Sequence, residues 1–160
     1  MAKELERKYK LNYIPGGNLV RHRIKQGYLA FDGNKHLRVR IIDDSVAYLT
    51  FKTIISSQEK NEYEYEIPLS DGIELYDSTN IKLEKERICT LDEYNNKVDI
   101  DLFDNGIQVV EIEFNEPPPT LPDYCGEDVT EQKEYSNIYI AKLFSVNQSH
   151  VSRIINNKYK

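Results

Sequence analysis

The sequence is poor in the residues on which several common kinds of site depend. Its 160 residues include two cysteines, Cys89 and Cys125, and three scattered histidines. Two cysteines without the spacing of metal ligands are too few for a disulfide framework, which favours free thiols in a reducing cytoplasm. The chain also has no HExxH zinc motif, no P-loop and no glycine-rich dinucleotide fingerprint.

Long apolar segments are missing as well. No apolar run approaches the ~18 residues of a membrane span, and the N-terminus has no apolar signal segment, so we expect a cytoplasmic chain without membrane contact. The net charge of −6 and isoelectric point of about 5.2 argue against nucleic-acid binding through bulk charge. They do not exclude binding through a local basic patch. The length fits one domain with a sizeable core.

Short strand-like runs separated by turn residues are abundant. We predict strands over 3–11, 27–31, 36–42, 46–53, 61–67, 81–90, 97–103 and 107–114. Turn residues separate these runs, and Asp104-Asn105-Gly106 is short enough to close a hairpin. Many short strands at near-regular spacing favour a barrel or a sandwich.

Helical signals are fewer. Short helices are predicted over 19–25, behind Asn18 as N-cap, and from Ser70 or Asp71 through Tyr76. The triple proline at 117–119 ends the strand-rich part as a local stiff bend, and beyond it the pattern predicts helices over 130–144 and 148–156.

Charged residues recur two positions apart, with one sign of charge along each run. The acidic sets are Glu4 and Glu6; Glu62, Glu64 and Glu66; Asp99 and Asp101; and Glu111 and Glu113. The basic sets are Arg38 and Arg40, and Lys85 and Arg87, with Lys8 following the first acidic pair and Lys52 alone on its run. Because successive side chains of a strand point to opposite faces, each strand has a charged face and an apolar or aromatic face.

Two structures explain such rows. One is an antiparallel sheet with a solvated side, on which cross-strand ion pairs stabilise little. The other is a closed barrel lined by separate acidic and basic zones, in which bases neutralise phosphate oxygens and acids hold metal ions. We favour the barrel, because a merely solvated face has no reason to hold each strand to one sign.

The same runs, taken in order, resemble the CYTH domain, also called the triphosphate tunnel metalloenzyme family. Its hallmark ExExK strand is matched by Glu4, Glu6 and Lys8, and the resemblance continues through Leu37-Arg38-Val39-Arg40-Ile41 and Val110-Glu111-Ile112-Glu113-Phe114 to about residue 142. It implies an α+β, mainly antiparallel β fold: an eight-stranded closed tunnel barrel with a few flanking helices. On this basis the tunnel domain covers 1–145 and a helical tail covers 146–160.

The resemblance also implies a function and a set of roles. The chain would be a hydrolase, a triphosphatase that binds a triphosphate-containing small molecule with Mg²⁺ or Mn²⁺. Glu4, Glu6, Glu111 and Glu113 would bind the metal, and Lys8 with Tyr28 would act near the reacting phosphoryl group. The phosphates would contact Arg38, Arg40, Lys52, Lys85, Arg87 and Lys133, with Glu62, Glu64 and Asp101 as supporting acids. The chain departs from the family at Glu134 and Lys60, where an arginine is frequent.

Alternatives stay open at this point. The first is an adenylate cyclase of the same superfamily, which would need a base-recognising pocket that no motif here indicates. The second is a nucleotide-sensing DNA-binding regulator, because residues 138–157 resemble a helix-turn-helix motif. We prefer a tail helix that covers the barrel, since two helices lack the third that completes such a motif. A homodimer is also left open.

Overall fold

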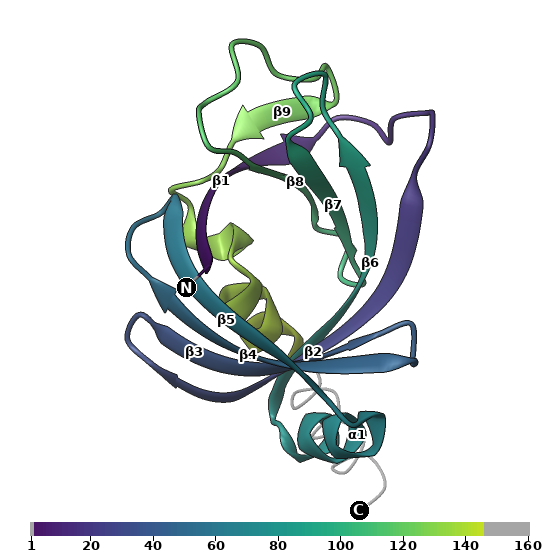
Figure 1. Ribbon diagram of the computed structural model, residues 1–160, viewed down its shortest axis with the longest axis vertical. Coiled ribbons are helices and arrows are strands. Elements are labelled where there is room, and N and C mark those ends of the chain that lie inside the picture. Colours follow the sequence, from purple (N-terminus) through teal and green to yellow (C-terminus); the bar gives the residue numbers. More distant parts are fainter. Residues whose placement is uncertain (1, 146–160) are drawn as a thin grey trace, which may run out of the picture.

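The protein forms a closed antiparallel barrel. In the computed structural model, which describes residues 2–145 and the side chains of 5–145, nine strands follow the order β5-β4-β3-β2-β6-β7-β8-β1-β9. Pairing of β1 with β5 closes the first eight of these into a ring. The ninth strand, β9, lies outside the ring and pairs with the C-terminal end of β1 (Figure 1). The predicted eight-stranded barrel is confirmed, with one strand added.

The strands lie close to their expected positions. They are β1 (Ala2–Leu11), β2 (Val20–Asp32), β3 (Lys35–Ile42), β4 (Val46–Ile54), β5 (Glu59–Ile67), β6 (Ile81–Leu91), β7 (Lys97–Phe103), β8 (Gln108–Glu113) and β9 (Cys125–Asp128). The predicted hairpin between β7 and β8 is confirmed, and Gly106 takes the positive φ of 92° that this turn requires.

Two of the predicted helices need correction. Residues 19–25 are not a helix, because Val20 to Tyr28 of β2 pair with β6 along their whole length. The helix predicted over 130–144 starts late: residues 133–135 form a short 3₁₀ helix (η1, Lys133–Tyr135), and the α-helix begins at 137. The helix predicted over 148–156 lies outside the described residues.

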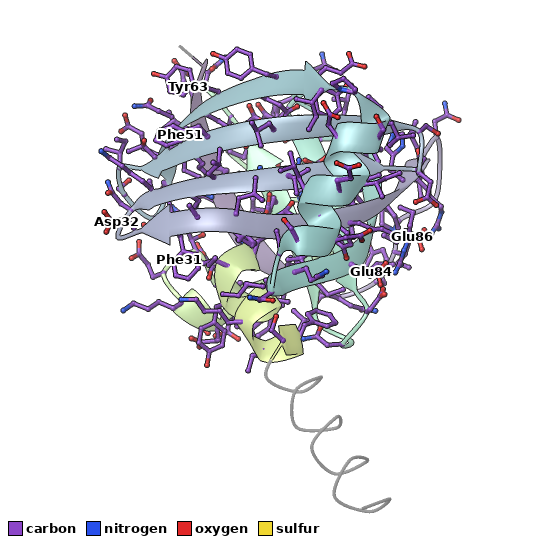
Figure 2. The ribbon with its side chains drawn as sticks, turned by 90° about the horizontal axis from the view of Figure 1, so that it is seen from below. Phe31, Asp32, Phe51, Tyr63, Glu84 and Glu86 are labelled. Atoms are coloured by element: carbon purple, nitrogen blue, oxygen red, sulfur yellow. The ribbon has the colours of Figure 1, made fainter. Side chains whose placement is uncertain are left out.

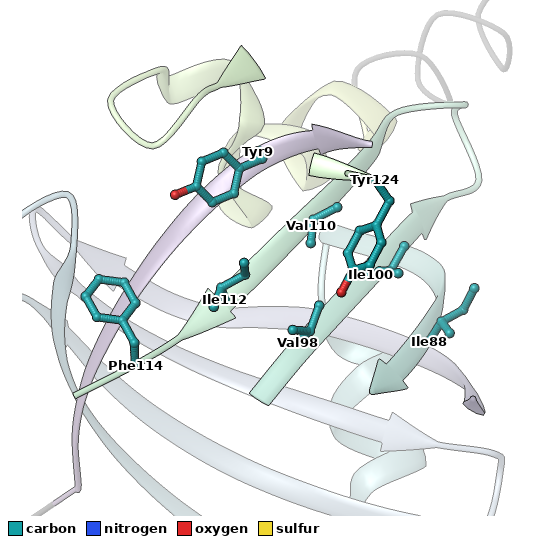
Figure 3. Close-up of a cluster of buried hydrophobic side chains, with 8 residues drawn as sticks. All are labelled: Tyr9, Ile88, Val98, Ile100, Val110, Ile112, Phe114 and Tyr124. Carbon is teal, nitrogen blue, oxygen red and sulfur yellow. The ribbon is translucent and has the colours of Figure 1, made fainter. Parts of the chain in front are cut away.

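Apolar side chains lie mostly on the outside of the barrel wall. On β7, Val98 and Ile100 are fully buried on the face opposite Asp99 and Asp101. They join a cluster that the segment after β8, including Tyr124, covers from outside (Figure 3). Burying each such side chain contributes about 1.5–3 kcal/mol, so the outer cluster stabilises a wall whose inner face is left for charged groups.

Two helices cover other parts of the barrel. Helix α1 (Leu69–Ser78) lies across the outer face of β2, β3 and β4 (Figure 2), and its Gly72 fits there because an added Cβ would come within 2.3 Å of Ala47. The C-terminal helix, described over 137–145, lies across one end of the lumen (Figure 1). Its Ile140 and Ala141 are fully buried against Tyr28 and Phe103 in an apolar plug. No helix within residues 2–145 is long and apolar enough to cross a bilayer.

Candidate active site

The charged rows line a cavity inside the barrel. This tunnel cavity has a volume of about 330 Å³, and every side chain at its wall is charged or an amide. Its lining is Glu6, Arg38, Arg40, Lys52, Glu62, Glu64, Arg87, Lys97, Asp99, Glu111, Glu113 and Asn137. The prediction that the charged faces point inward is therefore confirmed. The geometry brings together nine of the residues to which the resemblance gave a role.

Two cations of the tunnel cavity lack an acidic partner among the side chains of 5–145. Neither Arg40 nor Lys52 forms an ion pair with any acid whose side chain is described. Burial lowers the pKa of Arg40 to about 10, and the positive charges of Arg38 and Arg87 add to this effect. The pKa of Lys52 is also well below its usual value, because of burial and then of Lys60 and Arg38. This part of the wall favours an anion.

Arg38 is ion-paired with an acid from β5, and one of its N–H donors has no hydrogen-bond partner among the described residues. Its Nη2 donates to Glu62 Oε1 over 2.5 Å, and both side chains are nearly buried. Its Nε is buried and has no hydrogen-bond partner among the described residues. Since an unpaired buried donor is costly, this nitrogen also favours a ligand oxygen or a water molecule.

On the opposite wall, Glu111 is surrounded by cations. Its Oε1 lies 3.2 Å from Lys8 Nζ, directly across the β1–β8 pairing, and its Oε2 lies 3.9 Å from Arg87 Nη2. Burial alone would raise the pKa of Glu111, but the charges of Lys8 and Arg87 outweigh it and hold the pKa well below its usual value. Glu111 is therefore a fixed carboxylate at neutral pH.

The pKa of Glu113 is shifted in the opposite direction, upward. Burial raises its pKa; the nearby carboxylates of Glu6 and Asp99 add to the rise, whereas Lys97 opposes it. Asp99 Oδ1 is buried and unpartnered among the described side chains. Negative charge is thus crowded at this end of the tunnel cavity, and a cation would relieve it.

The acids of the tunnel cavity supply the type of ligand that a hard divalent cation binds. Carboxylate oxygens are the ligands that Mg²⁺ and Mn²⁺ prefer, and Glu6, Glu111 and Glu113 all line the tunnel cavity. Among the side chains of 5–145, no three such groups converge into a ready-made ion site. Glu6 is instead ion-paired with Lys60 from β5. The backbone of Glu4 lies in β1 opposite Lys60, and its side chain is outside the described residues.

A buried charge network lies directly behind the wall. Asp101 accepts from Arg87 Nε at 2.7 Å and from Lys85 Nζ at 2.8 Å, and neither Asp101 nor Lys85 is exposed to solvent. Burial would raise the pKa of Asp101, but Arg87 and Lys85 hold it at about 2. Burial and the charge of Arg87 lower the pKa of Lys85 to about 7. Asp101 thus orients two predicted phosphate-binding bases, as a supporting acid would.

The two residues expected near the reacting phosphoryl group are not joined by a hydrogen bond in residues 5–145. Lys8 Nζ donates to the Tyr135 carbonyl at 2.8 Å as well as pairing with Glu111. The Tyr28 hydroxyl accepts from Gln26 Nε2 at 2.9 Å, and burial raises the Tyr28 pKa. Tyr28 packs in the apolar plug and does not border the tunnel cavity.

A second, wider pocket of about 600 Å³ adjoins the tunnel cavity and shares Glu6 with it. Lys8 and Lys133 line this pocket rather than the tunnel cavity, together with Tyr135 and Tyr139. The phosphate contact expected of Lys133 therefore lies outside the tunnel cavity in this conformation.

Sequence reasoning missed several residues of the site. Asp99 was recognised in the acidic row of β7 but was given no role, and Lys97, two positions before it, was not named at all, although the same two-residue period could have found it. Asn137 comes from the C-terminal helix, and no spacing rule links it to the strands. Lys60 was noted only as a substitution, and its ion pair with Glu6 depends on the β1–β5 closure.

Comparison with known proteins agrees with this geometry. A curated inorganic triphosphatase from Acetivibrio thermocellus is 32% identical over 149 residues, which is 89% of this chain and 95% of that protein. One from Nitrosomonas europaea is 27% identical and covers 86% and 96%, respectively. A crystal structure of an inorganic triphosphatase superposes with a TM-score of 0.65 at 29% identity, over 88% of this chain and 95% of that chain. The CYTH domain profile matches residues 2–142, and the chain therefore belongs to the CYTH domain family.

Proposed function

We propose that this chain is a metal-dependent triphosphatase that hydrolyses the terminal phosphoryl group of a triphosphate, with inorganic triphosphate as the first candidate. The observation that carries the proposal is the pair of cations, Arg40 and Lys52, that line the tunnel cavity without an acidic partner among the described side chains. A chain of phosphates supplies the negative charge that this wall lacks. The relatives named above are inorganic triphosphatases that this chain matches over nearly their whole length, and they support the same reaction.

The bases would hold the substrate. An arginine side chain binds phosphate oxygens through two parallel donors, whereas a lysine acts as a point charge. Arg38, Arg40 and Arg87 come from β3 and β6, so they would grip the phosphate chain from two parts of the ring. Because burial and strand pairing fix these side chains, little reorganisation is needed when substrate enters.

The acids would hold a divalent cation against the same phosphates. Glu6, Glu111 and Glu113, with Glu4, are the residues that would bind Mg²⁺ or Mn²⁺. When bound, the ion would neutralise charge on the phosphoryl oxygens and help to position the attacking water. Lys8, which lies 3.2 Å from Glu111, would keep that carboxylate ionised and oriented. In this role it supports the site even without a hydrogen bond to Tyr28.

The lining of the tunnel cavity favours inorganic triphosphate over the cyclase alternative. Its wall has only charged and amide side chains, and none of them offers an apolar surface for a base. The wider pocket beside it has aromatic side chains, so an organic group attached to the triphosphate is the second candidate.

A phosphate-release assay tests the proposal. Inorganic triphosphate, ATP and thiamine triphosphate are compared with Mg²⁺, with Mn²⁺ and with chelator. We expect metal-dependent release, fastest from inorganic triphosphate. Release from none of the three with either metal would overturn the proposed function, and cyclic AMP formed from ATP would favour the cyclase.

A further inference from the structure

The start of the C-terminal helix brings an amide side chain into the tunnel cavity. Ser136 acts as the N-cap: its Oγ accepts from the Tyr139 backbone N–H at 3.3 Å, and its carbonyl accepts from the Ile140 N–H at 3.0 Å. Asn137 is consequently the first residue of the helix and lines the tunnel cavity beside the bases. It is the one uncharged side chain in that lining.

The orientation of the Asn137 amide is determined by its neighbour. Lys85 Nζ, which is ion-paired with the Asp101 carboxylate, donates to Asn137 Oδ1 at 2.9 Å. The amide oxygen must therefore face Lys85, which leaves the two N–H donors of Nδ2 directed away from it. These donors have no hydrogen-bond partner among the side chains of 5–145.

Lys85 is itself held firmly. Its side chain is fully buried, it donates to Asp101 at 2.8 Å, and its ammonium lies 5.1 Å from the centre of the Phe103 ring. A buried donor held by a carboxylate and an aromatic ring makes a rigid support for the Asn137 oxygen. Lys85 does not border the tunnel cavity, whereas Asn137 does.

We propose that Asn137 binds the substrate directly, donating a hydrogen bond from Nδ2 to a phosphoryl oxygen, and that Lys85 positions it. The inference rests on the proposed function and adds a ligand that comes from the C-terminal helix rather than from the barrel strands. It also gives the helix a role beyond closing one end of the lumen.

A neutral donor suits this position. Arg40 and Arg87 both line the same cavity, and Lys85 lies just behind it. A further cation among these three would be repelled by all of them, so a base at position 137 would be costly to bury. An amide adds a contact to phosphate without adding charge.

Two substitutions at this position separate a binding role from a structural one. Asn137→Ala removes both the donor and the acceptor. Asn137→Asp keeps an acceptor for Lys85 and adds an ion pair, but it replaces the donor with a carboxylate. Asn105→Asp is the matched control, because it adds the same charge in an exposed turn outside the tunnel cavity and keeps the acceptor used by the Ile107 N–H.

The measurement is calorimetric titration of inorganic triphosphate into each full-length protein in the presence of chelator, together with the melting temperature and the steady-state constants with Mg²⁺. Since a hydrogen bond to a charged group is worth a factor of about 10 or more, we expect Asn137→Ala to raise the dissociation constant by at least about 10-fold. We expect Asn137→Asp to melt at or above the wild-type temperature and yet to bind more weakly than Asn137→Ala. The control should bind as the wild type does.

Wild-type binding in Asn137→Asp would overturn the inference and leave the proposed function intact, because it would show that an acceptor for Lys85 is all that the position requires. If Asn137→Ala fails to fold, Asn137→Asp alone decides between the two outcomes. A wild-type protein that neither binds nor hydrolyses triphosphate would overturn both the proposed function and the inference.

Discussion

Arg40 uses one edge of its guanidinium on Gln26, to which its Nε donates over 2.9 Å. The two residues face each other across the β2–β3 pairing, so this bond fixes the plane of the guanidinium. Its two terminal nitrogens have no partner among the described side chains, although Arg40 lines the tunnel cavity. A planar group with one edge fixed and two donors left over is suited to bridging two phosphate oxygens.

We predict that Arg40→Ala raises the KM for inorganic triphosphate by about 10-fold to 100-fold and lowers kcat, since the lost bonds are charge-assisted. Arg40→Lys should rescue only part of the loss, because an ammonium cannot reproduce the two parallel donors or the bond to Gln26. Steady-state kinetics at saturating metal measure both variants. Arg21→Ala, an exposed arginine paired with Glu86, is the control. Full activity in Arg40→Lys would contradict a bidentate role.

We predict that Glu113→Gln lowers metal-dependent turnover by about 100-fold or more while the protein stays folded. The expected reason is the loss of a carboxylate that holds the ion against the phosphates, an interaction worth several kcal/mol. The fold should tolerate the change, because the side chain is 37% exposed and its nearest cation, Lys97, is 4.0 Å away.

Turnover with increasing Mg²⁺ and the melting temperature test this prediction together. Glu116→Gln, at an exposed position in the segment after β8, controls for the loss of one negative charge. Wild-type turnover of Glu113→Gln at saturating metal would remove Glu113 from the metal site.

We predict that His36 makes the protein less stable in mild acid. Burial, together with the charges of Lys52 and Arg38, lowers the His36 pKa from 6.5 to about 4. Between these values the unfolded chain binds more protons than the folded one. The contribution of this site is therefore complete above pH 6.5 and is lost as the pH falls toward 4, by up to about 3 kcal/mol.

Urea unfolding of the wild type and of His36→Gln at pH 7.5, 5.5 and 4.5 measures this effect. The difference in unfolding free energy between the two proteins should shrink or reverse as the pH falls. A constant difference over this range would show that folded His36 titrates near its ordinary pKa.

Most of the barrel wall could be predicted from the sequence, because two-residue alternation determines which face of a strand each residue occupies. Arg38 and Arg40 share the inner face for this reason. The same rule failed at 19–25, where Val20 and Ile24 have helical spacing. There the pairing of β2 with β6 decides the structure, and local preference does not. β9 was missed because Cys125–Asp128 has no apolar alternation and is recognisable only from its pairing with β1.

The parts of the site that could not be predicted depend on contacts between distant segments. Lys60 meets Glu6 only because β1 and β5 close the barrel. Asn137 reaches the tunnel cavity because Ser136, the residue before it, caps the C-terminal helix and makes Asn137 its first residue. Lys60 and Glu6 are 54 positions apart in the sequence, and Asn137 is 52 positions from its partner Lys85. Neither contact leaves a periodic pattern in the sequence.

We predict that deleting 146–160 leaves the rate constant of hydrolysis nearly unchanged. Among the described residues, the last in the tunnel cavity lining is Asn137 and the last in the adjoining pocket is Lys142, and both remain in the truncated chain. Some loss of stability is expected if Val146, Val151, Ile154 and Ile155 bury apolar surface in the full chain.

The helix-turn-helix alternative makes a different prediction: the full chain should bind duplex DNA with strong salt dependence, and the truncated chain should not. Phosphate release, melting temperature and DNA binding at two salt concentrations distinguish these cases. A folded truncation that no longer hydrolyses triphosphate would show that the tail takes part in the site, contrary to the division of the chain at residue 145.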